Sequence, residues 1–332
     1  MRAPAFWRQS ERGLPALLLA PAGFLWGAIA SRRMAQTGVE ADVPVLCIGN
    51  FTAGGAGKTP TALACADILS KNGFRPAFLT RGYGGSLSSQ PTPQRIDLHR
   101  HGAAEAGDEP LLLARHAPTF VCRDRAASAQ AAAALGANAV IMDDGLQNPG
   151  LNKTLSIAVV DGETGIGNGL CIPAGPLRAP LAAQLRKVDG LVVIGEGEAG
   201  DAVAGRALAQ AKAVFHARLQ PDPEIAAQLR GRKVVAFAGI GRPEKFFATL
   251  EETGADIAEA FAFGDHQTLD AGEVETLQRA AASHGAQLVT TEKDFVRVGA
   301  LFGNTPPVAL PVKLVIEDEA GFCAFLLRAM TH

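Results

Sequence analysis

VPVLCIGNFTAGGAGKTP, residues 43–60, joins a run of apolar residues to a glycine-rich segment and then to a proline that suits a first helical turn. A buried strand that leads through such a loop into a helix is typical of phosphate-binding loops, whose backbone N–H groups surround the phosphates. The strict pattern G-x-x-x-x-G-K-[ST] requires glycine where Thr52 stands, so the match is incomplete. The stretch predicts a site for ATP and Mg²⁺.

The candidate contacts to ATP come from one continuous segment. They are Thr52, Ala53, Gly54, Gly55, Ala56, Gly57, Lys58 and Thr59. The Lys58 ammonium would neutralise β- and γ-phosphate oxygens, and the Thr59 hydroxyl would bind Mg²⁺. A carboxylate at the end of a neighbouring strand should complete the metal site, and Asp143 and Asp144 meet this requirement at the end of NAVIMDD. The sequence does not decide which of the two approaches the metal.

Short apolar runs alternate with alanine-rich stretches from residue 43 onward. Strands that are apolar throughout should be buried on both faces, as in a parallel sheet covered by helices. The predicted fold class is therefore α/β, with a P-loop NTPase-like, doubly wound, mostly parallel sheet. The expected strands are 43–49, 75–80, 118–122, 138–144, 155–161 and 190–195, and the expected helices are 60–72, 108–116 and 125–135.

A second, smaller α/β pattern follows a segment rich in Gly, Ala and Glu. It predicts strands at 233–241, 256–263, 287–294 and 308–316, and helices at 243–253, 271–284 and 318–330. A chain of 332 residues exceeds the usual size of one hydrophobic core. We therefore expect three parts, namely an apolar amino-terminal segment (1–35), a P-loop domain (36–215) and a smaller carboxy-terminal domain (216–332).

The amino-terminal segment contains GLPALLLAPAGFLWGAIA, residues 13–30, an uncharged run with arginines on both sides. A helix of this length spans about 27 Å, whereas a hydrocarbon core is about 30 Å thick. Pro15 and Pro21 are expected to interrupt it. Three interpretations are open: a membrane-inserted or interfacial anchor, a cleaved signal peptide, and a helix of the core. Export is the least coherent, because it would take an ATP site to a compartment without ATP.

Composition argues against several other functions. The formal net charge of −2 and an aromatic content of 6% give no reason to expect a nucleic-acid partner. The five cysteines are far apart and show no CxxC spacing, so neither a zinc site nor a disulfide framework is predicted. No obligate protein partner is predicted either.

Several motifs of the chain resemble those of the tetraacyldisaccharide 4′-kinase family, the lipid A 4′-kinases of Gram-negative bacteria. They occur in family order. The matching stretches are GNFTAGGAGKTP (49–60), LTRGYGG (79–85), AGDEPLLLA (106–114), DDGLQNP (143–149), GIGNG (165–169), IPAGPLR (172–178), AGIGRPEKFF (238–247), FGDHQ (263–267) and TTEKD (290–294).

This resemblance implies transfer of the ATP γ-phosphate to the 4′-hydroxyl of an acylated glucosamine disaccharide 1-phosphate, the lipid A precursor. The reaction would take place at the cytoplasmic face of the bacterial inner membrane, with the membrane surface as a further partner. By motif, Asp108 would be the base that activates the hydroxyl, His266 its partner and Lys58 the third catalytic residue. From the residues alone, Asp108 could instead begin a helix, and His266 could be a loop residue. Closure of the smaller domain is expected to bring these two side chains together.

Three arginines, Arg81, Arg125 and Arg178, are candidates to grip the substrate 1-phosphate or the phosphates of ATP. The chain departs from the family pattern at Ala179, where the family commonly has glutamate. Two other functions remain open, a membrane-associated P-loop ATPase that acts as a switch and a kinase for a small metabolite. Switch ATPases characteristically carry a lysine at the position of Ala53, which weakens the first of these alternatives.

Overall fold

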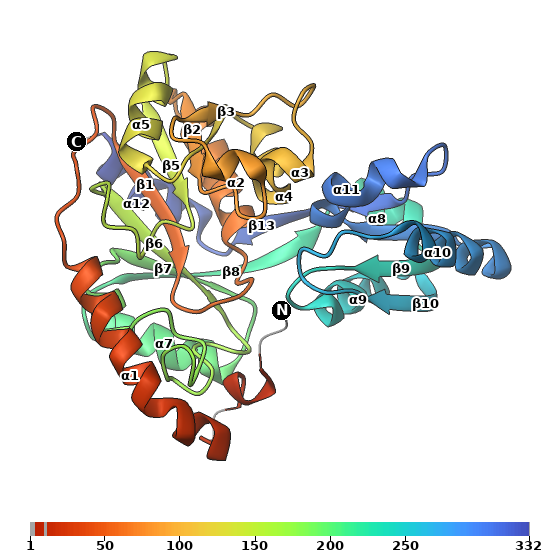
Figure 1. The fold of residues 1–332 in the computed structure, drawn as a ribbon, viewed down its shortest axis with the longest axis horizontal. Helices are drawn as coiled ribbons and strands as arrows, with labels where there is room; N and C mark the ends of the chain where they lie inside the picture. The colour runs from red at the N-terminus through yellow and green to blue at the C-terminus, as the bar shows by residue number, and fades with distance from the viewer. Residues whose placement is uncertain (1–3, 10–11, 332) are drawn as a thin grey trace.

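The computed structural model describes residues 4–9 and 12–331, and these form two α/β units with an apolar helix along the outside of the larger one (Figure 1). Within the described residues, the large unit contains a nine-stranded sheet and the small unit a four-stranded sheet. The predicted fold class, a mostly parallel α/β sheet with a second α/β unit and an apolar amino-terminal helix, is confirmed.

The large sheet explains why its strands are apolar throughout. Its strands are β1 (Val45–Asn50), β2 (Pro76–Thr80), β3 (Gln94–Arg95), β4 (Thr119–Val121), β5 (Ala139–Asp143), β6 (Leu155–Asp161), β7 (Gly190–Ile194), β8 (Ala213–Pro221) and β13 (Val312–Ile316). They lie in the order β13-β8-β7-β6-β1-β5-β2-β4-β3, and every neighbouring pair is parallel except those of the edge strands β13 and β3. All residues of β1, β2 and β5 are buried.

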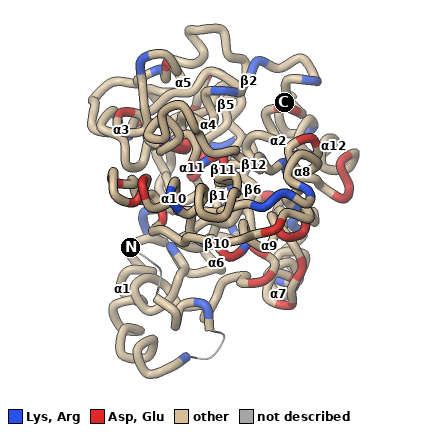
Figure 2. Tube along the Cα trace, turned by 90° about the vertical axis from the view of Figure 1, so that its right-hand side faces the viewer, with Lys and Arg blue, Asp and Glu red and all other residues tan. Residues whose placement is uncertain are grey.

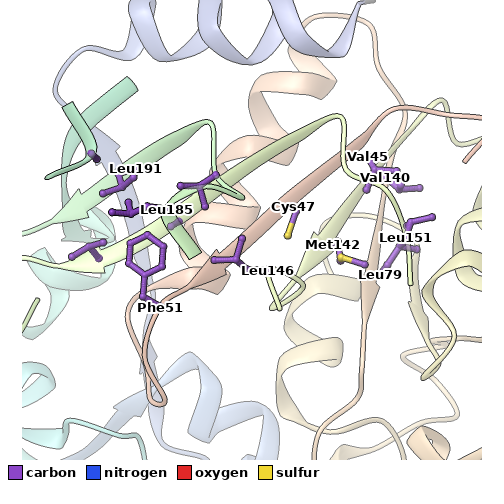
Figure 3. Close-up of a cluster of buried hydrophobic side chains, with 14 of the residues drawn as sticks. Val45, Cys47, Phe51, Leu79, Val140, Met142, Leu146, Leu151, Leu185 and Leu191 are labelled. Carbon is purple, nitrogen blue, oxygen red and sulfur yellow. The ribbon is translucent and has the colours of Figure 1, made fainter. Parts of the chain in front are cut away.

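Helices bury both faces of this sheet. The short segments η2 (Ser86–Ser89) and α3 (Ala103–Ala106) lie in the connection after β2. One face is covered by α2 (Lys58–Lys71), α4 (Asp108–Ala114) and α12 (Glu319–Met330), and the other by α5 (Arg125–Ala134), α6 (Leu181–Leu185) and α7 (Glu198–Leu208). Figure 3 shows the second layer, in which Phe51, Leu146 and Leu185 lie next to one another. Each fully buried side chain of this kind contributes roughly 1.5–3 kcal/mol through the hydrophobic effect.

The small unit has the same construction at reduced size. Its strands and helices are β9 (Lys233–Ala238), β10 (Asp256–Ala262), β11 (Gln287–Thr291), β12 (Val308–Leu310), α8 (Pro223–Leu229), α9 (Pro243–Glu252), α10 (Ala271–His284), α11 (Glu292–Val298) and η3 (Gly299–Phe302). The strands are parallel in the order β10-β9-β11-β12. The helices α8 and α9 pack on one face of this sheet, and α10 and η3 pack on the other.

The boundaries of the units differ from those expected from the sequence. Residues 308–316 were predicted as one strand, but Pro311 divides them into β12 of the small sheet and β13 of the large sheet. Proline has no N–H to donate to a ladder, and the Pro311 carbonyl instead accepts from the Asp222 N–H at 2.8 Å. Because β8 and α12 also pack in the large unit, residues 216–221 and 312–331 lie outside the small one.

The helix α1 (Leu14–Met34) follows the short η1 (Ala5–Trp7) and continues through Pro21 without ending. It packs through two glycines. A Cβ on Gly23 would come within 2.7 Å of the Cys171 carbonyl oxygen, and one on Gly27 within 3.0 Å of the Cys171 sulfur. The opposite side is exposed and apolar, with Leu18 72% and Phe24 81% accessible, and Figure 2 shows the helix almost free of charge along its length. This exposure argues against the interpretation as a core helix.

Candidate active site

The glycine-rich loop connects β1 to α2 at the carboxyl end of the strand, where β5 lies on one side of β1 and β6 on the other. Ligands of open α/β sheets bind at this kind of switch point. Gly54 and Gly57 have φ values of +117° and +87°, which other residues adopt only with strain. A Cβ on Gly57 would lie 2.5 Å from Ile194 Cδ1, whereas Gly54 and Gly55 face open space. The loop is therefore tightly packed at Gly57 and open at Gly54 and Gly55, where a phosphate would bind.

Lys58 is the first residue of α2, two residues earlier than predicted. Its Nζ lies 3.5 Å from the Gly54 carbonyl oxygen and 3.8 Å from Asp144 Oδ1. Arg178 contacts the same carboxylate, because its Nη2 donates to Asp144 Oδ2 at 3.0 Å while its Nε donates to the Thr52 carbonyl oxygen at 3.0 Å. Arg178 thus ties the first residue of the loop to the acidic end of β5.

Asp143 and Asp144 have opposite electrostatic environments although they are adjacent. Burial, together with the charges of Glu109 and Asp144, raises the pKa of Asp143 despite Lys58. Burial also acts on Asp144, but the positive charges of Lys58 and Arg178 more than offset it and lower the pKa of this carboxyl. Among the described side chains, Asp143 Oδ1 and Asp144 Oδ1 are buried without a hydrogen-bond partner. Two unsatisfied carboxylate oxygens opposite a phosphate loop fit a hard divalent cation such as Mg²⁺.

Asp108 is the first residue of α4 and is 4% exposed. Two side chains of the small unit contact its carboxylate. His266 Nδ1 lies 3.0 Å from Asp108 Oδ2 and 3.2 Å from Oδ1. Arg297, from α11, donates through Nη1 to the same Oδ2 at 2.9 Å, and its Nη2 bonds the Gly239 carbonyl oxygen and the Asp294 carboxylate. The contact that closure of the smaller domain was expected to make is thus already present.

These partners control the ionisation of Asp108. Burial by itself raises its pKa, but the His266 hydrogen bond and the charges of Lys293, His266 and Arg297 outweigh burial and lower the pKa to about 2. The carboxylate therefore stays ionised at neutral pH in a nearly dry environment. As a carboxylate surrounded by the donors of His266 and Arg297, Asp108 acts as a hydrogen-bond acceptor.

The small unit also approaches the phosphate loop directly. A Cβ on Gly241 would lie 3.7 Å from the Gly55 nitrogen and 3.6 Å from Asp265 Oδ2, so the loop after β9 lies between the glycine-rich segment and the loop of His266. Beside it, Arg242 Nη1 and Lys245 Nζ contact Asp161 at 3.0 and 2.5 Å. These ion pairs hold the two units together next to the site.

Known proteins resemble this chain over almost its whole length. The family model described as tetraacyldisaccharide-1-P 4′-kinase matches residues 15–331. The chain belongs to that family. A protein of Methylobacterium nodulans named tetraacyldisaccharide 4′-kinase is 55% identical over 329 residues, covering 99% of this chain and 95% of the relative. A protein of Methylorubrum extorquens with the same name is 55% identical, and the match covers all of both chains.

A solved structure resembles this member of the tetraacyldisaccharide 4′-kinase family in fold. It is LpxK from Aquifex aeolicus in complex with ATP, with a TM-score of 0.72 and 25% identity, covering 95% of this chain and 99% of the other. The comparisons confirm the predicted family resemblance and the predicted class of enzyme, an ATP-dependent kinase.

The three predicted phosphate-gripping arginines of this kinase lie in different environments. Arg81 directly follows β2 and is exposed. Arg125 is 4% exposed, and its Nη1 donates to the carbonyl oxygens of Thr80 and Cys122, which supports a structural role. Arg178 is engaged with the phosphate loop. A role toward the substrate stays a prediction for all three.

Sequence reasoning missed Arg297 and Lys293. Both lie on α11, and Arg297 contacts Asp108 from a position 189 residues further along the chain. The sequence does show that Lys293 and Arg297 are four residues apart, a spacing that places two side chains on one face of a helix. Nothing in that spacing indicates which acid they meet.

Proposed function

We propose that the chain transfers the γ-phosphate of ATP to the 4′-hydroxyl of tetraacyldisaccharide 1-phosphate in lipid A biosynthesis, with Asp108 as the general base. The observation that carries this proposal is the ionised, buried Asp108 carboxylate held by His266 and Arg297 beside a phosphate loop. The family assignment supports the choice of acceptor.

The residues around the loop can hold MgATP. The open backbone at Gly54 and Gly55 would receive the phosphates, and Lys58 would bind their oxygens. The cation would be held by Thr59, Asp143 and Asp144, and it would neutralise charge that develops on the transferred group. Arg178 would keep Asp144 aimed at this position.

Asp108 would act mainly late in the reaction. A carboxylate whose pKa is about 2 is a weak base, so it accepts the hydroxyl proton only once the new O–P bond has weakened the O–H bond. In a loose phosphoryl-transfer transition state the nucleophile needs orientation before deprotonation. Asp108 would first accept a hydrogen bond from the 4′-hydroxyl and then take its proton, while His266 and Arg297 keep the carboxylate oriented.

The apolar helix α1 would bring the enzyme to its substrate. Of the described helices, α1 is the one that is long and apolar enough to cross a membrane, with a length of about 31 Å. Its middle, however, is held against the large unit through Gly23, Gly27 and the bond from Trp26 Nε1 to the Arg178 carbonyl oxygen. A helix crossing the bilayer would carry these contacts into the hydrocarbon. Partial embedding at the cytoplasmic surface of the inner membrane, where ATP is present, fits the contacts better.

Two measurements test this proposal. ATP turnover by the full chain in detergent micelles should be slow without lipid acceptor and should rise when tetraacyldisaccharide 1-phosphate is added, with labelled phosphate recovered in the lipid. Rapid hydrolysis without acceptor and no labelled lipid would favour the switch ATPase instead. For the membrane contact, a variant with both Leu18→Glu and Phe24→Glu should lose binding to phosphatidylglycerol vesicles. The exposed Leu135, changed to Glu, serves as the control and should bind like wild type.

A further inference from the structure

The helix α11 presents two cations to the Asp108–His266 pair, and the proposed reaction leaves one of them without a function. Lys293 and Arg297 are four residues apart and therefore lie on the same side of the helix. Arg297 binds Asp108 directly. Lys293 Nζ instead lies 3.2 Å from His266 Nε2, on the side of the imidazole ring away from Asp108.

The two ring nitrogens of His266 therefore face groups of opposite kind. Nδ1 faces a carboxylate that can only accept, while Nε2 faces an ammonium that can only donate. A proton on Nε2 would put two donors against each other at 3.2 Å. The Asp265 carboxylate is 3.7 Å from Nε2, beyond hydrogen-bond distance, so it does not offer that proton an acceptor. The contacts are all satisfied only when Nε2 is bare and Nδ1 carries the hydrogen.

We propose that Lys293 is a positioning residue that fixes the tautomer of His266, so that Nδ1–H donates to Asp108 and orients its carboxylate toward the substrate hydroxyl. The inference rests on the proposed function, because it assigns Lys293 a part in that reaction. The wrong tautomer would place a ring lone pair against the Asp108 carboxylate and turn the two groups apart.

Lys293 is itself held as a charged donor. Its Nζ contacts Glu109 Oε1 at 3.2 Å and lies 3.7 Å from Asp265 Oδ1. Burial lowers the pKa of Lys293, but the charges of Glu109, Asp108 and Asp265 outweigh burial and raise it. The ammonium is therefore protonated at neutral pH, with three N–H donors and no acceptor atom.

The ring is fixed from the backbone as well. His266 has a φ of +60°, and its N–H donates to the Gly239 carbonyl oxygen at 3.2 Å. The same Gly239 accepts from Arg297 and donates to Asp294 of α11 at 3.0 Å. Because the helix and the histidine loop share this anchor, the distance between Lys293 and the ring is held by the fold of the small unit.

The competing explanation is that Lys293 only joins the two units through its ion pair with Glu109. Lys245 provides a matched control, since it is also a lysine of the small unit paired to a carboxylate of the large one, Asp161, at 2.5 Å. Among the described residues, Lys245 does not contact His266. Lys293→Met removes the ion pair with Glu109, and Lys245→Met removes those with Asp161 and Glu163, so the control loses at least as many pairs between the units. Only Lys293→Met frees Nε2.

The test combines kinetics with spectroscopy on the full chain. We expect Lys293→Met to lower kcat by about 10²-fold, the scale of a small displacement of a catalytic group, with ATP affinity unchanged. Lys293→Arg, which keeps a donor, should recover most of the loss, and Lys245→Met should turn over like wild type. In ¹⁵N spectra of histidine-labelled protein, assigned with His266→Gln, wild type should show protonated Nδ1 and bare Nε2, and Lys293→Met a mixture of tautomers.

A wild-type kcat in Lys293→Met, equal losses in the two lysine variants, or an unchanged tautomer in Lys293→Met would each overturn the inference. The ¹⁵N spectra report the tautomer of His266 whether or not the enzyme is active. If wild type itself transfers no phosphate to lipid, the proposed function fails, and the tautomer measurement still decides whether Lys293 controls His266.

Discussion

Replacing Asp108 by asparagine removes the proposed base while keeping the shape of the side chain. Asparagine has one oxygen to accept from either His266 or Arg297, and its amide group faces a donor where the second oxygen was. Loss of a general base costs 10²–10⁴ in rate, so we expect kcat to fall about 10³-fold, equivalent to about 4 kcal/mol of transition-state stabilisation. ATP affinity should stay close to wild type, because the partners of Asp108 lie on α11 and the His266 loop.

The same substitution has a defined effect on stability. The pKa of Asp108 falls from 3.8 to about 2 on folding, which corresponds to roughly 2–3 kcal/mol for this nearly fully buried group. Because the folded pKa is the lower one, this contribution is present above about pH 4 and is lost as the pH falls toward 2. Asp108→Asn should therefore be less stable than wild type at pH 7 by up to this amount, and the difference should shrink at pH 3.

Three measurements check this prediction. They are steady-state kinetics with lipid acceptor, calorimetric titration with an ATP analogue, and urea unfolding at pH 7 and pH 3. Asp294→Asn is the control, since Asp294 shares Arg297 with Asp108 but, among the described residues, makes no contact with His266, and it should keep more of the turnover. A turnover close to wild type in Asp108→Asn, or a fall in ATP affinity that matches the fall in kcat, would remove Asp108 from the role of base.

Other predictions concern the phosphate loop and its acidic partner. Lys58→Ala should abolish transfer of label from ATP to lipid and weaken ATP binding at least about tenfold, and normal turnover would exclude its phosphate contact. Asp143→Asn should raise Tm in metal-free buffer, and it should do so more at pH 8 than at pH 4. Because folding raises the pKa of Asp143, ionisation of this carboxyl at higher pH destabilises the folded state of wild type. A lower Tm of the variant at pH 8 would contradict this. Gly57→Ala should cost at least about 1 kcal/mol more than Gly73→Ala in urea unfolding, since both have positive φ but only Gly57 meets Ile194, and equal losses would refute it.

The sequence predicted the strands of the large sheet well because burial on both faces makes each of them continuously apolar, as in β1. It failed at Pro311, where one apolar run serves two sheets. An apolar run predicts that its residues are buried, but it does not predict which sheet they join. A proline such as Pro311 does not decide this either, because prolines also occur at the ends of strands within a single sheet. The antiparallel return of β13 to β8 depends on contacts almost a hundred residues apart.

The candidate site divides in the same way. Lys58, Asp143 and Asp144 could be inferred because phosphate and metal chemistry needs those groups at fixed places relative to one strand and its neighbour. Asp108 and His266 came from motif resemblance, and the structure brings them to 3.0 Å. Their remaining partners on α11 could not be inferred, because a lysine and an arginine on a helix are usually surface residues, and only the packing of the two units shows which carboxylate they meet.

The most direct test of the central claim is where the transferred phosphate goes. The full chain would be incubated with [γ-³²P]ATP and either tetraacyldisaccharide 1-phosphate or the same lipid lacking the 4′-hydroxyl. The lipids would then be separated and counted for ³²P, and the site of phosphorylation would be assigned by ³¹P NMR on a parallel reaction with unlabelled ATP. Our account predicts one new phosphomonoester at the 4′ position of the first lipid and no labelled lipid from the second. Label in the 4′-deoxy lipid, or label released only as inorganic phosphate from both, would contradict it.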